Sequence, residues 1–470
     1  MRILNMLHAT CLLFLFSGQL GAQELPIPVV DALQRAEIPL AAVSAYVQQT
    51  ESEAALVAVN ETIPFNPASV MKLVTSNAAL ETLGPAFAWK TQAYADGTQN
   101  GDVLHGDLII KGSGDPKLVL ENFWLFLRRI RAQGIREIRG DLVLDRSAFD
   151  DVPYDPALFD GDPLKPYNVG PDALLLNYKA INFRFVPDAA AAAVGVSIDP
   201  PLAAYPVYPP TLTNGDCNDW RGRLAPDING RSARFNGVFS AACGERVWYV
   251  HPYRMSHAEY FHLAFRRIWA DLGGTLKGEL RNGVVPPSAR LVAEWQSAPL
   301  SEIIRDINKY SNNVMARQLL LTLANRVMNL PANTERGAAV VRTWLASKGI
   351  DAPELRIENG SGLSRTERIS ALTMGRMLDA AFRAPTMPEF IASLPLVGHD
   401  GTMRLRLVTQ EVAGKAHIKT GMINEVRNIA GYVLAASGRR YVVVCMINHA
   451  NAIRGQEAQD ALLQWVYENG

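Results

Sequence analysis

Hydrophobic and polar positions follow strand and helix periods in turn along the chain. Residues 41–50 and 55–62 show the pattern of paired strands. They lead into a mostly apolar stretch, 65–84, with Asn66 and Pro67 at its start and Gly84 at its end. These residue types are typical of helix boundaries, so the pattern predicts one helix over 65–84.

The C-terminal end predicts three strands and a final helix. The strands cover 414–423, 427–437 and 439–449, with a Ser437-Gly438 turn between the last two. In the final helix, 455–470, the apolar side chains form one stripe, which consists of Ala458, Ala461, Leu462, Trp465 and Val466. We expect the strands from both ends of the chain to share one sheet, which makes the middle of the chain an insertion.

The middle of the chain changes its composition twice. Residues 89–151 combine short strands with one helix near 122–134, and frequent prolines over 155–251 indicate a small β-rich module. Helical patterns return over 255–273, 300–329 and 335–349. We therefore expect helices on both sides of a β-rich insertion.

Composition and charge are those of an ordinary globular protein of two or three domains. Of the 470 residues, 48% are hydrophobic and 20% are charged, and the formal net charge of +0 gives no reason to expect nucleic acid as a partner. The N-terminus has one arginine, an apolar run up to Phe16 and small residues up to Ala22. This pattern predicts a secretory signal peptide over 1–22, cleaved before Gln23. No later stretch is long and apolar enough to predict a transmembrane segment.

The positions of the cysteines are consistent with export to an oxidising compartment. After the predicted signal peptide the sequence has Cys217, Cys243 and Cys445. Cys217 and Cys243 flank a short segment with turn-forming residues, and we expect them to form a disulfide in an oxidising compartment. Cys445 lies in an apolar run that predicts a buried strand, where a thiol serves as a small core side chain.

Ser69 and Lys72 lie three residues apart in the predicted helix at 65–84. Residues at this spacing share a face of a helix, and a lysine there can simply extend its apolar stem to solvent. A Ser-x-x-Lys pair is also common by chance. The other interpretation is that Ser69 is a nucleophile and Lys72 its base, because a serine hydroxyl attacks poorly until a neighbour accepts its proton.

Two further motifs favour the chemical interpretation. Ser311 and Asn313 form a Ser-x-Asn pair at the start of a predicted helix, and Lys419-Thr420-Gly421 lies on a predicted strand. Ser-x-x-Lys, Ser-x-Asn and Lys-Thr-Gly in this order are typical of β-lactamases and penicillin-binding proteins.

The sequence more closely resembles the exported D-alanyl-D-alanine carboxypeptidase/endopeptidase family, the class C low-molecular-mass penicillin-binding proteins. The resemblance covers nearly the whole chain after residue 22. It includes about 240 residues between Ser69 and Ser311, and it is carried by FNPASVMKLVT, KGSGDPKL, residues 172–183, KYSNNVMA, ENGSGLSR and GHDGTMRLRL.

The resemblance implies an α/β penicillin-recognising serine-transferase fold, an antiparallel sheet flanked by helices, with inserted β-rich domains. It places the transpeptidase-like core at 23–92 and 288–470, one inserted domain at 93–165 and 253–287, and a β-rich inserted domain at 166–252. The implied activity is that of a periplasmic serine DD-peptidase. Such an enzyme cleaves D-Ala-D-Ala ends (carboxypeptidase) and D-Ala-diamino acid crosslinks (endopeptidase) of peptidoglycan stem peptides, and β-lactams acylate it.

By resemblance, five side chains carry the chemistry. Ser69 attacks the D-Ala-D-Ala carbonyl and becomes an acyl-enzyme, and Lys72 accepts its proton. Ser311 and Asn313 complete the proton path and hold the substrate backbone, and Lys419 supplies positive charge. Because a nearby cation lowers the pKa of a lysine, Lys419 can keep Lys72 partly neutral.

Substrate binding is expected on the Lys-Thr-Gly strand, and the oxyanion hole is expected to combine this strand with Ser69. The resemblance assigns Thr420 to the terminal carboxylate of the substrate and Gly421 to close approach of the substrate to the strand edge. An oxyanion hole needs two donors, for which the backbone N–H groups of Ser69 and Met422 are the candidates. The family usually has a hydroxyl residue at the position of Met422, so one partner of the carboxylate is absent here.

The remaining polar clusters fit structural roles better. His257, Glu259 and His262 do not form a zinc motif, because residues five apart differ by about 140° around a helix, and we expect neither a metal nor another cofactor. Ser361 and Ser364 fit turn positions, which the resemblance places near the cleft. The acidic residues of one loop could meet an ammonium group of the substrate, but a solvated loop is the better interpretation; they are Asp150, Asp151, Asp155, Asp160 and Asp162.

Two other functions share the three motifs. A β-lactamase needs fast deacylation, and the expected helical region has no Glu-x-x-Leu-Asn box to supply the base. A sensor of penicillin or peptidoglycan would acylate without turnover, and the lack of a predicted membrane span argues against it. Release of D-alanine from a pentapeptide separates the three functions. The sequence leaves the oligomeric state open.

Overall fold

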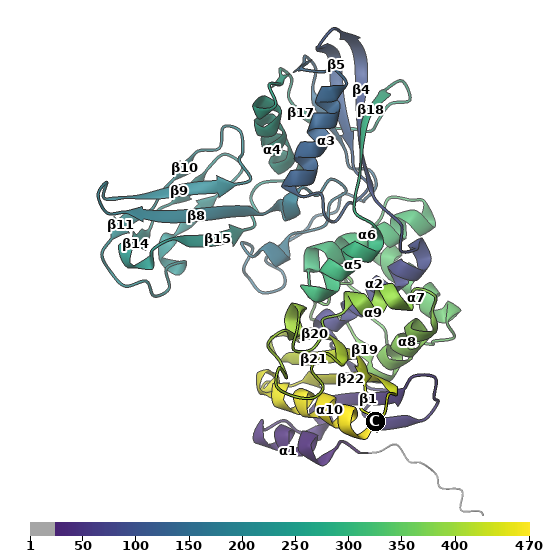
Figure 1. Ribbon diagram of the computed structural model, residues 1–470. Helices are drawn as coiled ribbons and strands as arrows, with labels where there is room; N and C mark the ends of the chain where they lie inside the picture. Colours follow the sequence, from purple (N-terminus) through teal and green to yellow (C-terminus); the bar gives the residue numbers. More distant parts are fainter. Residues whose placement is uncertain (1–23) are drawn as a thin grey trace, which may run out of the picture.

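The computed structural model describes residues 24–470, so the predicted signal peptide at 1–22 lies outside the described residues. Figure 1 shows three parts: a core made from both ends of the chain, a second part with helices against a sheet, and a β-rich part beside it. Within the described residues, no helix has both the length and the apolar character that crossing a membrane requires.

The core contains a five-stranded antiparallel sheet with the strand order β2-β1-β22-β21-β20. Val43 of β1 stands opposite Ile447 of β22, which joins the two ends of the chain in one sheet, as the sequence predicts. The strands are β1 (Val43–Gln49), β2 (Ala55–Val59), β20 (Ala416–Ile423), β21 (Val426–Leu434) and β22 (Arg440–Asn448).

Side chains of β22 alternate between two separate apolar clusters, because successive residues of a strand point to opposite faces. Val443 and Cys445 pack with α1 (Ile27–Arg35) and α10 (Gln456–Asn469). Val442 and Val444 pack with the helices of the other face. Those helices include α2 (Met71–Leu83), α5 (Leu300–Lys309), α6 (Asn313–Met328), α7 (Thr334–Ser347), α8 (Ala371–Arg383) and α9 (Met387–Ser393).

The helix predicted over 65–84 is shorter in the structure. Its first residues form β3 (Pro64–Phe65), which pairs with β19 (Ile369–Ser370), and a 3₁₀ turn, Ala68–Val70. Ala68 has a φ of +44°, which an α-helix does not allow, so α2 starts only at Met71. The predicted end is confirmed, because Gly84 caps the helix with a φ of +83°.

The second part is a seven-stranded sheet covered by α3 (Leu120–Ala132) and α4 (His257–Asp271) (Figure 1). The edge strand β18 (Arg290–Gln296) pairs with β4 (Lys90–Asn100), so these residues lie in the inserted sheet and not in the core segment expected from 288. The other strands are β5 (Val103–Lys111), β6 (Glu137–Ile138), β7 (Leu142–Asp145), β16 (Thr275–Leu276) and β17 (Leu280–Asn282).

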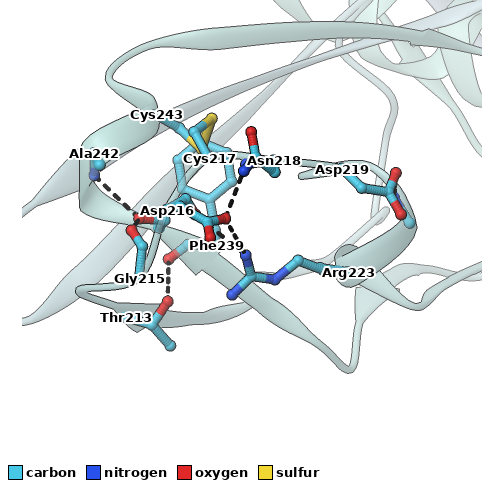
Figure 2. A network of polar contacts seen from close by, with 12 residues as sticks. Thr213, Gly215, Asp216, Cys217, Asn218, Asp219, Arg223, Phe239, Ala242 and Cys243 are labelled. Atoms are coloured by element: carbon cyan, nitrogen blue, oxygen red, sulfur yellow. Dashed lines mark hydrogen bonds and ion pairs between the residues drawn. A yellow bond between two sulfur atoms is a disulfide. The ribbon is translucent and has the colours of Figure 1, made fainter.

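The third part is a β-rich module with short sheets around an aromatic core. Cys217 and Cys243 form a disulfide there, next to the ring of Phe239, and Asp216 accepts a hydrogen bond from Arg223 at 3.1 Å (Figure 2). Its strands are β8 (Ile181–Asp188), β9 (Ala193–Asp199), β10 (Val207–Tyr208), β11 (Thr211–Thr213), β12 (Pro226–Ile228), β13 (Ala233–Phe235), β14 (Val238–Ser240) and β15 (Arg246–Val250).

Candidate active site

Ser69 lies in the 3₁₀ turn directly before α2, and the side chain of Asn66 holds this turn. Asn66 accepts a hydrogen bond from the backbone N–H of Ala68 at 2.9 Å and donates one to the carbonyl of Ser364 at 2.9 Å. Asn428 on β21 donates to the carbonyl of Asn66 at 2.9 Å. These contacts fix the left-handed backbone at Ala68, so Ser69 is held at the N-terminal end of α2.

Lys72 is fully buried, and its Nζ has three oxygen partners. Nζ lies 2.9 Å from Ser69 Oγ and 2.5 Å from Asn313 Oδ1, and it donates to the carbonyl of Ser361. Burial holds the pKa of Lys72 well below its usual value, and the positive charge of Lys419 lowers it further. A lysine in this position can accept a proton from a serine hydroxyl.

A break between α5 and α6 brings the Ser-x-Asn pair into the site. Ser311 has a φ of +56°, and the side chain of Asn312 caps α6 by accepting from the N–H of Met315 at 3.0 Å. In consequence Ser311 Oγ accepts from Lys419 Nζ at 2.9 Å, whereas Asn313 reaches Lys72. The two residues of one motif therefore contact the two different lysines.

Lys419 lies on β20 and is also fully buried. Its Nζ donates to Ser311 Oγ and, at 2.6 Å, to the carbonyl of Thr420. Burial lowers the pKa of Lys419 to about 7. Lys419 therefore carries its full charge only below neutral pH.

β20 forms an edge of the core sheet and lies against the Ser69 turn. A Cβ on Gly421 would lie 2.8 Å from the carbonyl O of Pro67 and 3.0 Å from the N of Ser69. The resemblance assigns Gly421 to close approach of the substrate. In the structure, the missing side chain of Gly421 also allows β20 to approach the Ser69 turn. Met422 follows and is an exposed residue, with a relative accessibility of 59%, and Thr420 Oγ1 donates to Thr402 Oγ1 at 2.8 Å.

Sequence reasoning did not assign the carbonyl of Ser361 or the hydroxyl of Thr402 to the site. The Ser361 carbonyl is a backbone group, so no residue type marks it. The glycines in ENGSGLSR are the one sequence signal that the backbone here forms a tight loop. Gly362 has a φ of +80°, and a Cβ there would meet the carbonyl of Ala68 at 1.8 Å. As expected, Ser361 and Ser364 form turns: their Oγ atoms accept from the N–H groups of Leu363 and Thr366.

The other polar clusters have structural contacts. Glu259 and Ser256 form a capping box at the start of α4. Asp150 accepts from Arg336 at 3.1 Å, and Asp160 accepts from Tyr167 at 2.7 Å. Within residues 24–470, no group of three His, Cys, Asp or Glu residues has the arrangement of a metal site.

Comparisons with known proteins give relatives over most of the chain. The model of the D-Ala-D-Ala carboxypeptidase 3 (S13) family matches residues 27–469. The D-alanyl-D-alanine carboxypeptidase of Actinomadura sp. (strain R39) is 29% identical over 388 residues, 79% of this chain and 71% of the relative. The D-alanyl-D-alanine carboxypeptidase DacB of Haemophilus influenzae is 26% identical over 390 residues, 81% and 80% of the two chains.

Solved structures confirm the predicted penicillin-recognising fold. Penicillin-binding protein 4 (dacB) of Haemophilus influenzae superimposes with a TM-score of 0.80 and 22% identity over 94% of this chain and 100% of that chain. Bd3459, a predatory peptidoglycan endopeptidase of Bdellovibrio bacteriovorus, gives a TM-score of 0.50 and 17% identity over 91% and 92% of the two chains. Because the family model covers almost the whole described chain, this protein belongs to the D-Ala-D-Ala carboxypeptidase 3 (S13) family.

Proposed function

We propose that this protein is a serine DD-peptidase that cleaves D-Ala-D-Ala in peptidoglycan stem peptides through an acyl-enzyme on Ser69. The observation that carries the proposal is the Lys72 Nζ, fully buried and 2.9 Å from Ser69 Oγ. A nucleophile needs an adjacent base whose pKa is lowered, and burial with a second cation supplies this. Relatives named D-alanyl-D-alanine carboxypeptidase over most of the chain support the substrate.

In the proposed acylation, Ser69 Oγ attacks the carbonyl carbon of the penultimate D-Ala, and its proton passes to Lys72. The N–H groups of Ser69 and Met422 receive the developing oxyanion, as donors in an oxyanion hole do. The C–N bond then breaks, and the departing D-Ala amine takes the proton that Lys72 accepted from Ser69. Water hydrolyses the ester and frees Ser69.

We assign the substrate's terminal carboxylate to the edge of β20. Lys419 supplies positive charge there below neutral pH, and Thr420 supplies a hydroxyl. Thr402 Oγ1, 2.8 Å from Thr420 Oγ1, offers a second hydroxyl beside Thr420, whereas the side chain of Met422 has none. Asn313, which contacts Lys72, is assigned to the substrate backbone.

The proposal extends to crosslinked peptides, to β-lactams and to the periplasm. A solved relative is complexed with a β-lactam, which supports acylation by β-lactams. Another is a peptidoglycan endopeptidase, which supports cleavage of crosslinked peptides. A β-lactam places a reactive carbonyl where the D-Ala-D-Ala carbonyl would lie, so the β-lactam acylates the Ser69 hydroxyl. The predicted signal peptide and the Cys217–Cys243 disulfide support the periplasm, because disulfides persist in oxidising compartments.

The test compares wild type with Ser69→Ala and with Ser76→Ala. Ser76 is a buried serine of α2, the helix that follows the Ser69 turn, and it contacts Asn308. Each protein is incubated with a fluorescent penicillin and with a stem pentapeptide. We expect wild type and Ser76→Ala to gain the penicillin mass and to release D-alanine, and Ser69→Ala to do neither.

Three results would contradict the proposal. Acylation of Ser69→Ala at the wild-type rate would remove Ser69 as the nucleophile. Rapid penicillin hydrolysis without D-alanine release would show a β-lactamase. Acylation without turnover of either compound would show a sensor.

A further inference from the structure

Glu367 is a fully buried carboxylate at the end of the loop that contacts Lys72. Its Oε1 accepts three backbone hydrogen bonds, from Glu358 at 3.1 Å, Asn359 at 2.9 Å and Gly360 at 2.9 Å. Its Oε2 has no hydrogen-bond partner in the described residues. Three N–H donors on one oxygen favour the ionised carboxylate. Glu367 therefore fixes the path of residues 358–360 with a negative charge.

The next two carbonyls of this loop contact α2. The carbonyl of Gly360 accepts from Thr75 Oγ1 at 2.7 Å, and the carbonyl of Ser361 accepts from Lys72 Nζ. The Asn359 side chain accepts from the N–H of Ser361 at 2.9 Å, which links the segment held by Glu367 to the carbonyl at Lys72. The position of the Ser361 carbonyl thus depends on Glu367.

Glu367 is also the negative group among the charged residues that act on Lys72. Lys419 on β20 and Arg317 on α6 are the cations that lower the pKa of Lys72, and Glu367 is the anion that raises it. Around Glu367, Arg317 faces it as a cation and Glu358 as an anion. The pKa of Glu367 is raised above its usual value, because burial outweighs the three backbone N–H groups that lower it. The charge of Glu367 therefore opposes two buried cations at the base.

We propose that Glu367 is a positioning residue for Lys72: it holds the Ser361 carbonyl against Nζ and opposes the charges of Lys419 and Arg317. The inference rests on the proposed function, because it assigns Glu367 a part in preparing the base of that reaction. Without the loop, Lys72 loses one of its three oxygen partners. Without the negative charge, Lys72 gives up its proton at a lower pH.

The experiment measures the acylation rate with a fluorescent penicillin as a function of pH. Glu367→Gln keeps an oxygen for the three N–H groups and removes the charge. The pKa of Lys72 then falls, neutral Lys72 exists at lower pH, and the acid limb of the profile moves down by about one pH unit. Asp145→Asn is the matched control, because Asp145 is a buried carboxylate that accepts from the N–H groups of Ser147 and Val285 in the inserted sheet.

An acid limb that moves in Glu367→Gln and stays in place in Asp145→Asn supports the proposal. An unmoved limb in folded Glu367→Gln overturns it, even if the rate falls at every pH. If Glu367→Gln does not fold, Glu367→Asp is measured instead. Aspartate retains the negative charge, so folded Glu367→Asp must keep the acid limb of the acylation profile at the wild-type pH. Failure of both variants to fold would assign Glu367 to folding alone. Wild type that is never acylated would instead refute the proposed function.

Discussion

Gly421→Ala tests whether close contact between β20 and the Ser69 turn is needed for acylation. The added Cβ would lie 2.8 Å from the carbonyl O of Pro67 and 3.0 Å from the backbone N atoms of Ser69 and Val70. All three are backbone atoms of the turn, so no side chain can rotate away. Ordinary contacts of a Cβ begin near 3.4 Å, so the strand and the turn must separate by roughly half an ångström.

The expected effect follows from where this separation occurs. Ser69 N–H and the N–H of Met422 flank the position of the clash and are the proposed oxyanion donors. A displacement of about 1 Å costs about a hundredfold in rate, so half an ångström should lower the acylation rate about tenfold. The overpacking should also lower the free energy of unfolding by about 1–3 kcal/mol.

Stopped-flow acylation by a fluorescent penicillin measures the rate, and urea unfolding measures the stability. Gly195→Ala on β9 is the control, because its nearest contact, the carbonyl O of Val186, would lie at an ordinary 3.6 Å. We expect wild-type acylation in that variant. Gly421→Ala that acylates within twofold of wild type, with unchanged stability, would show that the strand can yield and that the reasoning is wrong.

Two further predictions concern charge and the disulfide. Lys419→Met removes a cation that lowers the pKa of Lys72, so this pKa should rise. The acid limb of the pH profile of acylation should then move to higher pH. Movement to lower pH would contradict the assigned electrostatics. Replacing Cys217 and Cys243 with alanine should destabilise the β-rich module by about 3.5 kcal/mol for a separation of 26 residues. The acylation rate should not change; a parallel fall in rate would show that the module supports the site.

Much of the core follows from the sequence alone. The apolar runs of β21 and β22 are long because both faces of the sheet are covered, and such runs predict buried strands from composition. The three motifs were recognisable because their residue types and order are unusual together. Each motif is also local: Ser69 and Lys72 are neighbours on one helical turn, and their contact needs no distant segment.

The tertiary structure decided what the motifs contact. The division of Ser311 and Asn313 between two lysines depends on a left-handed residue between α5 and α6, which the helical pattern of 300–329 does not reveal. Similarly, β18 joins the inserted sheet through pairing with β4, about 200 residues away in sequence. Such backbone choices depend on packing between segments distant in sequence, which residue propensities do not encode.

The contacts around the base were least visible in the sequence. Ser361 meets Lys72 through a carbonyl, and Glu367 acts through three backbone N–H groups, so neither contact depends on a residue pair that a motif could mark. Every residue has such backbone groups, and only the folded chain decides which of them meet. The sequence by itself determined the nucleophile and its lysine as candidates; the fold determined the burial and charge that lower the pKa of Lys72.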